Sequence, residues 1–470
     1  MPLRPLSLCG EAPRGKPHGC LLRRSKAYGY EGWILAKKGE NFLRNKIMNF
    51  NTKKGKNRII RLYHNLSSRQ WVCFLFGSAM GVIIWTFSSS AVQDVIIFSA
   101  FLFALFFAGR GNFAWRQPAG IAFVILLIHH FIMLPFSVSP EMSVKDTGRM
   151  LEVLAGAFAI PVIFNTDKKI SRAIFYSAVG ITLTLAYDLV RMAFYLGPDI
   201  LVKAHSFRPF ILNHSNVASM MAGLSFFVFS YHIPQFLPGF SCGRERKSLW
   251  PALGCAAGGL VCLAYLIIAA SRGPQITFAL AFVFSGLIMP GWRNKFIWLI
   301  IIIILGAVLL ANYKLINPRF AEKKTMTGFS ERDKVWKHTW QLAQERPWFG
   351  YGYGKRNFEM NYYASQPPRA NYHFPHCHQY WLKLLFEYGW TGACLYAAAW
   401  LILAISLLRR ILTAQTLGDR LLPGVIALML LFIHLYGLGD YPDNIVQVAQ
   451  IWLIPAALVA LTGRNRESES

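Results

Sequence analysis

The residues best suited to chemistry lie near the end of one long polar segment, residues 313–378, in an otherwise apolar chain. The histidines His373, His376 and His378 lie close together there. A neutral imidazole can accept a proton near neutral pH, so a histidine in this place is a candidate general base. We favour His378, because it directly precedes the amphipathic run QYWLKLLFEYG, where the segment rejoins apolar sequence. His373 is better explained as an ordinary loop residue, and His376 as a residue that orients the base or contacts a substrate.

The same histidines also suggest a metal site, with Cys377 between His376 and His378. The spacing H-x2-H-x-H matches no standard zinc pattern, and no carboxylate lies nearby in the sequence. We therefore expect neither a metal nor another cofactor. Of the 8 cysteines of the chain, only Cys377 lies in residues 313–378, so we predict no disulfide in this segment.

Two arginines far from this segment are candidate anion ligands. Arg272 lies in SRGPQ between two apolar runs, where a charged group is costly unless it is paired or hydrated. Arg208 precedes PFILNHSN. A guanidinium binds phosphate oxygens in a bidentate fork, so a cluster of such arginines would suit a pyrophosphate. The alternative for both residues is anchoring to lipid headgroups.

One carboxylate, Asp440, completes the set of candidates. It lies in GLGDYPDN, between the last two apolar runs. Asp440 could orient a histidine such as His378 or bind an acceptor sugar, but an aspartate is also common in an ordinary turn. The sequence leaves these alternatives open.

The composition defines the class of protein that must position these residues. Of 470 residues, 54% are hydrophobic and only 15% are charged, which indicates a polytopic membrane protein. The net charge of +27 would suggest a nucleic-acid partner for a soluble protein. Here the basic residues fall in short stretches between apolar runs, as cytoplasmic loops do, so we expect membrane lipids and no nucleic acid as partners.

Apolar runs of about 20 residues predict an all-α membrane protein with about 12 transmembrane helices and one long periplasmic loop that contains short helices. The predicted spans are approximately residues 71–87, 91–108, 119–136, 149–164, 173–196, 216–237, 250–270, 276–290, a ninth ending near 312, 388–408, 421–437 and 446–462.

Basic turns between these spans predict the topology. They all fall on the side of the N-terminal tail, which we expect to be cytoplasmic. The chain then divides into a basic cytoplasmic tail that is disordered in its first part, helices 1–9, the periplasmic loop, helices 10–12 and a cytoplasmic C-terminal tail, at residues 1–70, 71–312, 313–378, 379–463 and 464–470. We expect a multi-pass protein of the bacterial inner membrane with a periplasmic active site. Met48 is an alternative start of translation.

The polar segment itself has a readable pattern. The letters SERDKVWKHTWQLAQERPWFGYGYGKRNF predict an amphipathic helix with tryptophans at the membrane interface, followed by a glycine-rich turn. The YGYG glycines could cradle a phosphate, but no GK[ST] follows them, so a tight turn is the better interpretation.

The order of these features resembles the O-antigen ligase and polymerase superfamily. It combines an SRG turn between two central spans, a loop that opens with an arginine and tryptophan helix, a P-x-F-G-x-G-x-G segment, and H-x-H at the start of the next span. These features are Ser271 to Gly273, Arg332 with Trp336, Pro347 to Gly354, and His376 with His378, followed by Leu382, Gly389 and Gly392. Gln379 stands where the family usually has asparagine.

The resemblance implies a metal-independent transfer of a glycan from undecaprenyl pyrophosphate to a sugar hydroxyl of lipid A-core oligosaccharide, in lipopolysaccharide biosynthesis. It implies His378 as the base, and Arg272 and Arg208 as the groups that hold the pyrophosphate, with Arg332 as a further ligand. An O-antigen polymerase and a protein oligosaccharyltransferase of the same superfamily are alternatives. A lipid-linked glycan transporter is the alternative outside enzymes.

Overall fold

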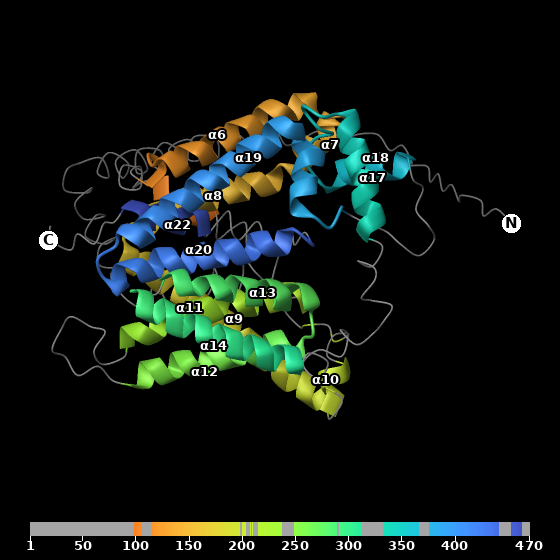
Figure 1. The fold of residues 1–470 in the computed structure, drawn as a ribbon. Helices are drawn as coiled ribbons and strands as arrows, with labels where there is room; N and C mark the ends of the chain where they lie inside the picture. The colour runs from red at the N-terminus through yellow and green to blue at the C-terminus, as the bar shows by residue number, and fades with distance from the viewer. Residues whose placement is uncertain are drawn as a thin grey trace, which may run out of the picture. The chain divides into compact units, whose positions relative to one another are not determined.

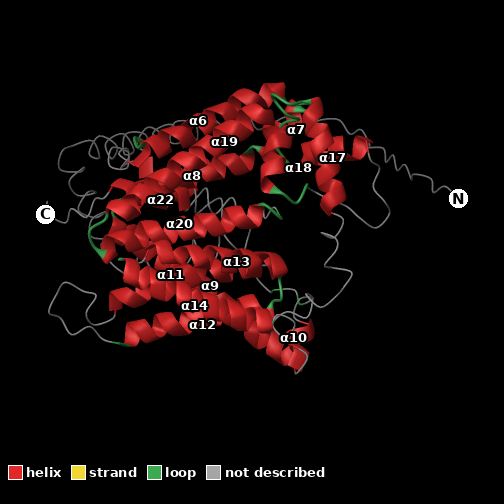
Figure 2. Ribbon diagram, in the orientation of Figure 1, coloured by secondary structure: helices red, strands yellow, loops and turns green. Residues whose placement is uncertain are grey.

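The computed structural model describes residues 98–102, 104–105, 114–197, 200–203, 207, 209, 215–236, 249–288, 291–312, 332–365, 376–440 and 453–462. The regular elements in these ranges are all helical (Figure 2), which confirms the all-α class. The predicted spans at 71–87, most of 91–108 and the first part of 446–462 lie outside the described residues. The number of 12 helices therefore stays a prediction.

The helices follow the apolar runs of the sequence closely. They are α6 (Pro118–Met133), η1 (Leu134–Phe136), α7 (Pro140–Asp146), α8 (Gly148–Ile163), α9 (Asp167–Leu196), α10 (Ile200–Lys203), α11 (Ser215–Phe236), α12 (Trp250–Ile268), α13 (Arg272–Phe284), η4 (Ser285–Ile288), α14 (Trp292–Ala311), α17 (Arg332–Glu345), α18 (Lys355–Ser365), α19 (Tyr380–Thr413), α20 (Leu417–Gly437) and α22 (Ile454–Thr462).

In the described part of the chain, six helices are long and apolar enough to cross a membrane: α6 with η1, α9, α11, α12, α19 and α20. Many of their apolar side chains face outward, such as Ile128 on α6 and Leu260 on α12, which are 53% and 66% exposed. An apolar outer surface on long helices suits a hydrocarbon solvent rather than water. The chain is therefore a multi-pass membrane protein.

Helix α20 joins two groups of helices (Figure 1). It contacts α11 and α13 on one side and α19 on the other, while α19 also packs against α6. Close aromatic packing holds α20 to its first group, because the rings of Phe278 and Phe432 lie 6.0 Å apart. Gly223 of α11 permits this approach, since a Cβ there would lie 2.5 Å from the Phe432 ring. The ends of α11, α13, α19 and α20 are thereby held in fixed relative positions.

The polar segment folds largely as its pattern predicts. The amphipathic helix is α17, whose buried face includes Val335, Thr339 and Leu342 and packs against the beginning of α19. With α7 and α18, it lies at one end of the bundle (Figure 1).

Helix α19 is broken near its start, and the glycine-rich turn repairs the break. Gly389 has non-helical angles (φ 62°, ψ −167°). The amide of Trp390 consequently donates to the carbonyl of Pro347 at 2.6 Å, and the carbonyl of Phe386 accepts from the amide of Tyr351 at 2.7 Å. The turn thus satisfies backbone groups that a continuous helix would pair internally.

Glycines are required where the two backbones touch. A Cβ on Gly350, which has φ +67°, would lie 2.5 Å from the carbonyl oxygen of Phe386, and a Cβ on Gly389 would lie 2.4 Å from the backbone of Trp348. The amide of Gly354 donates to the Glu387 carboxylate at 2.9 Å. The tight-turn interpretation therefore agrees with the structure. The phosphate-cradle alternative loses support, because these amides already have acceptors within the protein.

Candidate functional site

A buried carboxylate, Asp440, organises the polar cluster at one end of the helices. It lies just after α20, and its Oδ1 is 3.0 Å from His378 Nδ1. Its Oδ2 accepts hydrogen bonds from Arg332 at 3.1 Å and from the Tyr436 hydroxyl at 2.9 Å. Arg332 also donates to the carbonyl of Gly439 at 2.8 Å. The charge of Asp440 is thus balanced by a guanidinium and shared among several donors, which is what a buried carboxylate needs.

His378 has the orientation of a general base. An ionised carboxylate can only accept, so the hydrogen of the 3.0 Å bond belongs to His378 Nδ1 and Nε2 is the basic nitrogen of the neutral ring. The side chain of His378 is 21% exposed, so a substrate can reach it. Its backbone is in the left-handed region (φ 52°), which is unusual for a residue other than glycine and concentrates at functional positions.

His376 and Cys377 support the turn that presents His378. His376 Nδ1 accepts from the backbone amide of His378 at 3.3 Å, and the two imidazole rings are 4.3 Å apart. The Cys377 thiol is fully buried and donates to the carbonyl of Gln379 at 3.1 Å. Burial raises the pKa of Cys377 to about 12, so the thiol stays protonated and is no nucleophile. The described residues contain no group of three or more histidine, cysteine or acidic side chains arranged to hold a metal.

Arg272 is linked to the same cluster through its neighbour. Ser271 donates to Asn216 Oδ1 at 2.5 Å, and Asn216 Nδ2 donates to Asp440 Oδ2 at 3.3 Å. Arg272 follows directly as the first residue of α13 and is half-buried. Ala270, just before, has φ +47°, which marks the sharp break between α12 and α13 that the SRGPQ letters predict. The structure therefore brings the SRG turn beside the His378 cluster.

Several helix ends meet at this cluster. Asn216 lies in the first turn of α11, Arg272 and Arg332 begin α13 and α17, and His378 directly precedes α19. Helix N-termini carry unpaired backbone N–H groups and partial positive charge. The site therefore combines a base with an environment that favours a negatively charged ligand.

The structure unites most of the predicted site residues. His378, Asp440, Arg332 and His376 are in mutual contact or share a partner, and Arg272 lies one residue from a member of the network. Arg208 and His373 lie outside the described residues.

Two members of the cluster were missed from the sequence, Asn216 and Tyr436. Tyr436 lies four residues before Asp440, at helical spacing, and Gly273 leaves room for its ring, since a Cβ there would lie 2.9 Å from it. Asn216 lies in the LNHSN letters that follow Arg208. The tyrosine spacing was a readable signal, whereas the role of Asn216 depends on a contact across 224 residues.

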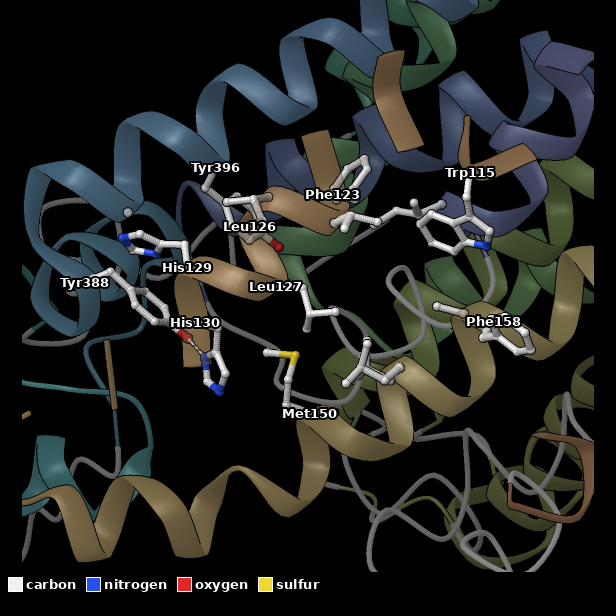
Figure 3. Close-up of a pocket in the computed structure, with 16 residues that line it drawn as sticks. Trp115, Phe123, Leu126, Leu127, His129, His130, Met150, Phe158, Tyr388 and Tyr396 are labelled. Carbon is white, nitrogen blue, oxygen red and sulfur yellow. Dashed lines mark hydrogen bonds between the residues drawn. The ribbon is translucent and has the colours of Figure 1, made fainter. Parts of the chain in front are cut away.

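A separate apolar cavity of about 350 Å³ lies between α6, α8 and α19 (Figure 3). Its walls are mainly hydrophobic, with His129 and His130 at one end, where His130 Nδ1 is 2.7 Å from the Tyr388 hydroxyl. None of the predicted site residues lines this cavity. It belongs to the membrane-spanning helices rather than to the polar cluster.

The fold and the cluster together define a multi-pass helical membrane protein with a histidine, aspartate and arginine site at the ends of its helices. Residues 257–397 match a family model described as O-antigen ligase, so the chain carries an O-antigen ligase family domain. This confirms the family resemblance. The matched residues include Arg272, Arg332 and His378 but end before Asp440. No curated protein matches the chain.

Proposed function

We propose that the protein is an O-antigen ligase that transfers a glycan from undecaprenyl pyrophosphate to a sugar hydroxyl of lipid A-core oligosaccharide. The reaction takes place at the periplasmic face of the inner membrane and needs no metal. The observation that carries this proposal is the hydrogen bond between His378 and Asp440 in a chain with an O-antigen ligase domain.

His378 acts on the acceptor. Its Nε2 takes the proton of the sugar hydroxyl while the hydroxyl oxygen forms a bond to the anomeric carbon of the donor glycan. Asp440 holds the ring by its Nδ1–H and stabilises the imidazolium that forms. The electrons of the breaking bond, between the anomeric carbon and the phosphate oxygen, pass to the pyrophosphate.

The leaving pyrophosphate gains negative charge in this step, and cations must stabilise it. Arg272, at the beginning of α13, is the principal candidate, with Arg208 as its partner. Arg332 is already bonded to Asp440, so its main role in this proposal is to fix the carboxylate. Preorganised cations in a site of low dielectric constant supply about 3–4 kcal/mol of transition-state stabilisation per donor.

Replacing His378 with Ala tests the proposal. In purified membranes we expect loss of glycan transfer to lipid A-core, with binding of the lipid-linked donor retained, because only the base is removed. His338→Gln is the matched control, since His338 lies in α17 and packs on Tyr362, outside the cluster, and should leave transfer intact. Normal transfer by the His378→Ala protein would remove the base assignment and would favour the transporter alternative.

Deleting the gene separates the ligase from a polymerase. Loss of a ligase should leave the lipid A-core without any O-antigen unit while lipid-linked glycan accumulates. Loss of a polymerase should leave a single repeat attached to the core. Gel analysis of lipopolysaccharide from the deletion strain distinguishes these outcomes, and a single attached repeat would refute the ligase.

A further inference from the structure

A groove lined by tryptophans lies beside the His378 cluster, between α17 and the beginning of α19. Its volume is about 560 Å³. The residues that give it its character are Trp336, Lys337, Trp340, Gln379, Trp381 and Trp390. No step of the proposed reaction uses it so far.

The groove is continuous with the site along both of its walls. On α17, Arg332, Trp336 and Trp340 recur every four residues, so the helix face that holds Asp440 at its first residue carries the two indoles further along. On the other wall, Gln379 directly follows His378. A molecule in this groove would therefore have one end at the base.

The groove also crosses from polar to apolar surroundings. Its α17 wall belongs to the polar segment, whereas Ala393 and Ala397 lie on α19 beyond the break at Gly389, in the membrane-spanning part. Small side chains there leave a shallow apolar channel along the helix. The groove thus has a place for a hydrocarbon chain and a place for a polar head.

The side chains at the polar end are suited to a phosphorylated sugar. Trp340 and Trp390 are 47% and 41% exposed and stand edge to face with their centroids 6.4 Å apart, so both present indole surface. Flat aromatic faces with a polar N–H bind amphipathic rings well. Lys337 is exposed and supplies a point charge for a phosphate, and Gln379 supplies an amide.

We infer that this groove binds the glycan acceptor, a phosphorylated glycolipid held in the outer leaflet, and delivers its hydroxyl to His378. This inference rests on the proposed function. The acceptor is favoured over the donor because the groove reaches the site at His378 and Gln379, on the side of the base. Arg272, the candidate ligand of the donor pyrophosphate, is not among the residues that line it.

The test is a kinetic comparison on the full-length protein in lipid nanodiscs. Initial rates are measured against acceptor concentration at saturating donor, and against donor at saturating acceptor. The double variant Trp340→Ala/Trp390→Ala should raise the apparent KM for acceptor roughly tenfold while the donor KM stays within about twofold. Trp348→Ala is the matched control, since Trp348 is 65% exposed in the same segment but does not line the groove. Its acceptor KM should be unchanged.

Lys337→Gln gives a second, independent readout. It should raise the KM for the phosphorylated acceptor about fivefold and have no effect with an acceptor whose phosphates have been removed, because the two changes then delete the same interaction. An unchanged acceptor KM in the double tryptophan variant would overturn the inference, as would an equal rise in Trp348→Ala, which would indicate interfacial anchoring alone. A selective rise in donor KM would assign the groove to the donor instead. Failure of the wild-type protein to transfer glycan would refute the proposed function itself, a result distinct from all of these.

Discussion

At the scale of single residues, Asp440 decides whether His378 can act as a base. Its carboxylate accepts from His378, Arg332, Tyr436 and Asn216, each from a different helix or turn. An imidazole with Nδ1–H held in this way has one tautomer and one orientation. The strength of the proposed base therefore depends on a residue that does not touch the substrate.

Replacing Asp440 with Asn should separate orientation from chemistry. The amide nitrogen cannot accept from Arg332 or His378, so we expect transfer to fall about 10²-fold or more, with donor binding little changed. Tyr436→Phe removes only one donor and should cost about tenfold at most. Single-turnover rates in nanodiscs measure both effects. Equal rates for Asp440→Asn and wild type would show that His378 needs no orienting carboxylate.

Arg272 should act on the donor rather than on the acceptor. Loss of a charge-assisted contact costs about 1.5–3 kcal/mol, so Arg272→Gln should weaken binding of undecaprenyl pyrophosphate by roughly 10–100-fold. Arg293→Gln, an exposed position in the first turn of α14, is the control and should bind normally. Binding is measured by titration of the labelled lipid into nanodiscs. Unchanged affinity in Arg272→Gln would favour lipid-headgroup anchoring for this arginine.

At the scale of elements, the docking of the glycine-rich turn on α19 holds the polar segment against the membrane domain. The exchange of backbone hydrogen bonds around Gly389 makes the turn and the helix one unit. The buried pair Lys383 and Glu387, 3.4 Å apart, adds a side-chain link, because Glu387 also accepts from the amide of Gly354. The position of His378, two residues before α19, therefore depends on this unit.

Gly350→Ala should disrupt that unit. A Cβ would lie 2.5 Å from the Phe386 carbonyl at a positive φ, so we expect a loss of about 2 kcal/mol or more in stability and faster proteolysis between α17 and α18. Gly197→Ala is the matched control, because Gly197 also has a positive φ but has open space around it, and should cost about 1 kcal/mol. Thermal unfolding in detergent and limited proteolysis compare the two. Equal effects would show that the backbone contact carries no stability.

At the scale of the whole molecule, the distribution of basic residues predicts which side of the membrane the site faces. Lys355, at the start of α18, lies at the same end as the site, whereas Gln415 lies in the turn between α19 and α20, next to Arg409 and Arg410. The positive-inside rule assigns that turn to the cytoplasm and α18 to the periplasm.

Cysteine labelling tests this orientation. On a background without native cysteines, Lys355→Cys should react with an impermeant maleimide in cells with a permeabilised outer membrane. Gln415→Cys should react only after the inner membrane is opened. The reverse pattern would place the site in the cytoplasm and exclude a periplasmic ligase.

The sequence by itself determined the helical membrane class, the course of most described helices and the identity of His378, Arg272, Arg332 and Asp440 as candidates. This was possible because apolar length, helical period and the cost of charge beside lipid are local properties that composition and spacing reveal. The start of α17 and the turn at Pro347 to Gly354 were readable for the same reason.

Only the tertiary structure decided which of these residues act together. The contact between His378 and Asp440 spans 62 residues, and the bond from Asn216 to Asp440 spans 224. Such pairings depend on how α11, α17, α19 and α20 pack, and packing is set by interdigitating side chains such as Phe278 and Phe432 rather than by any local pattern. The tryptophan groove beside His378 likewise exists only because α17 lies along α19.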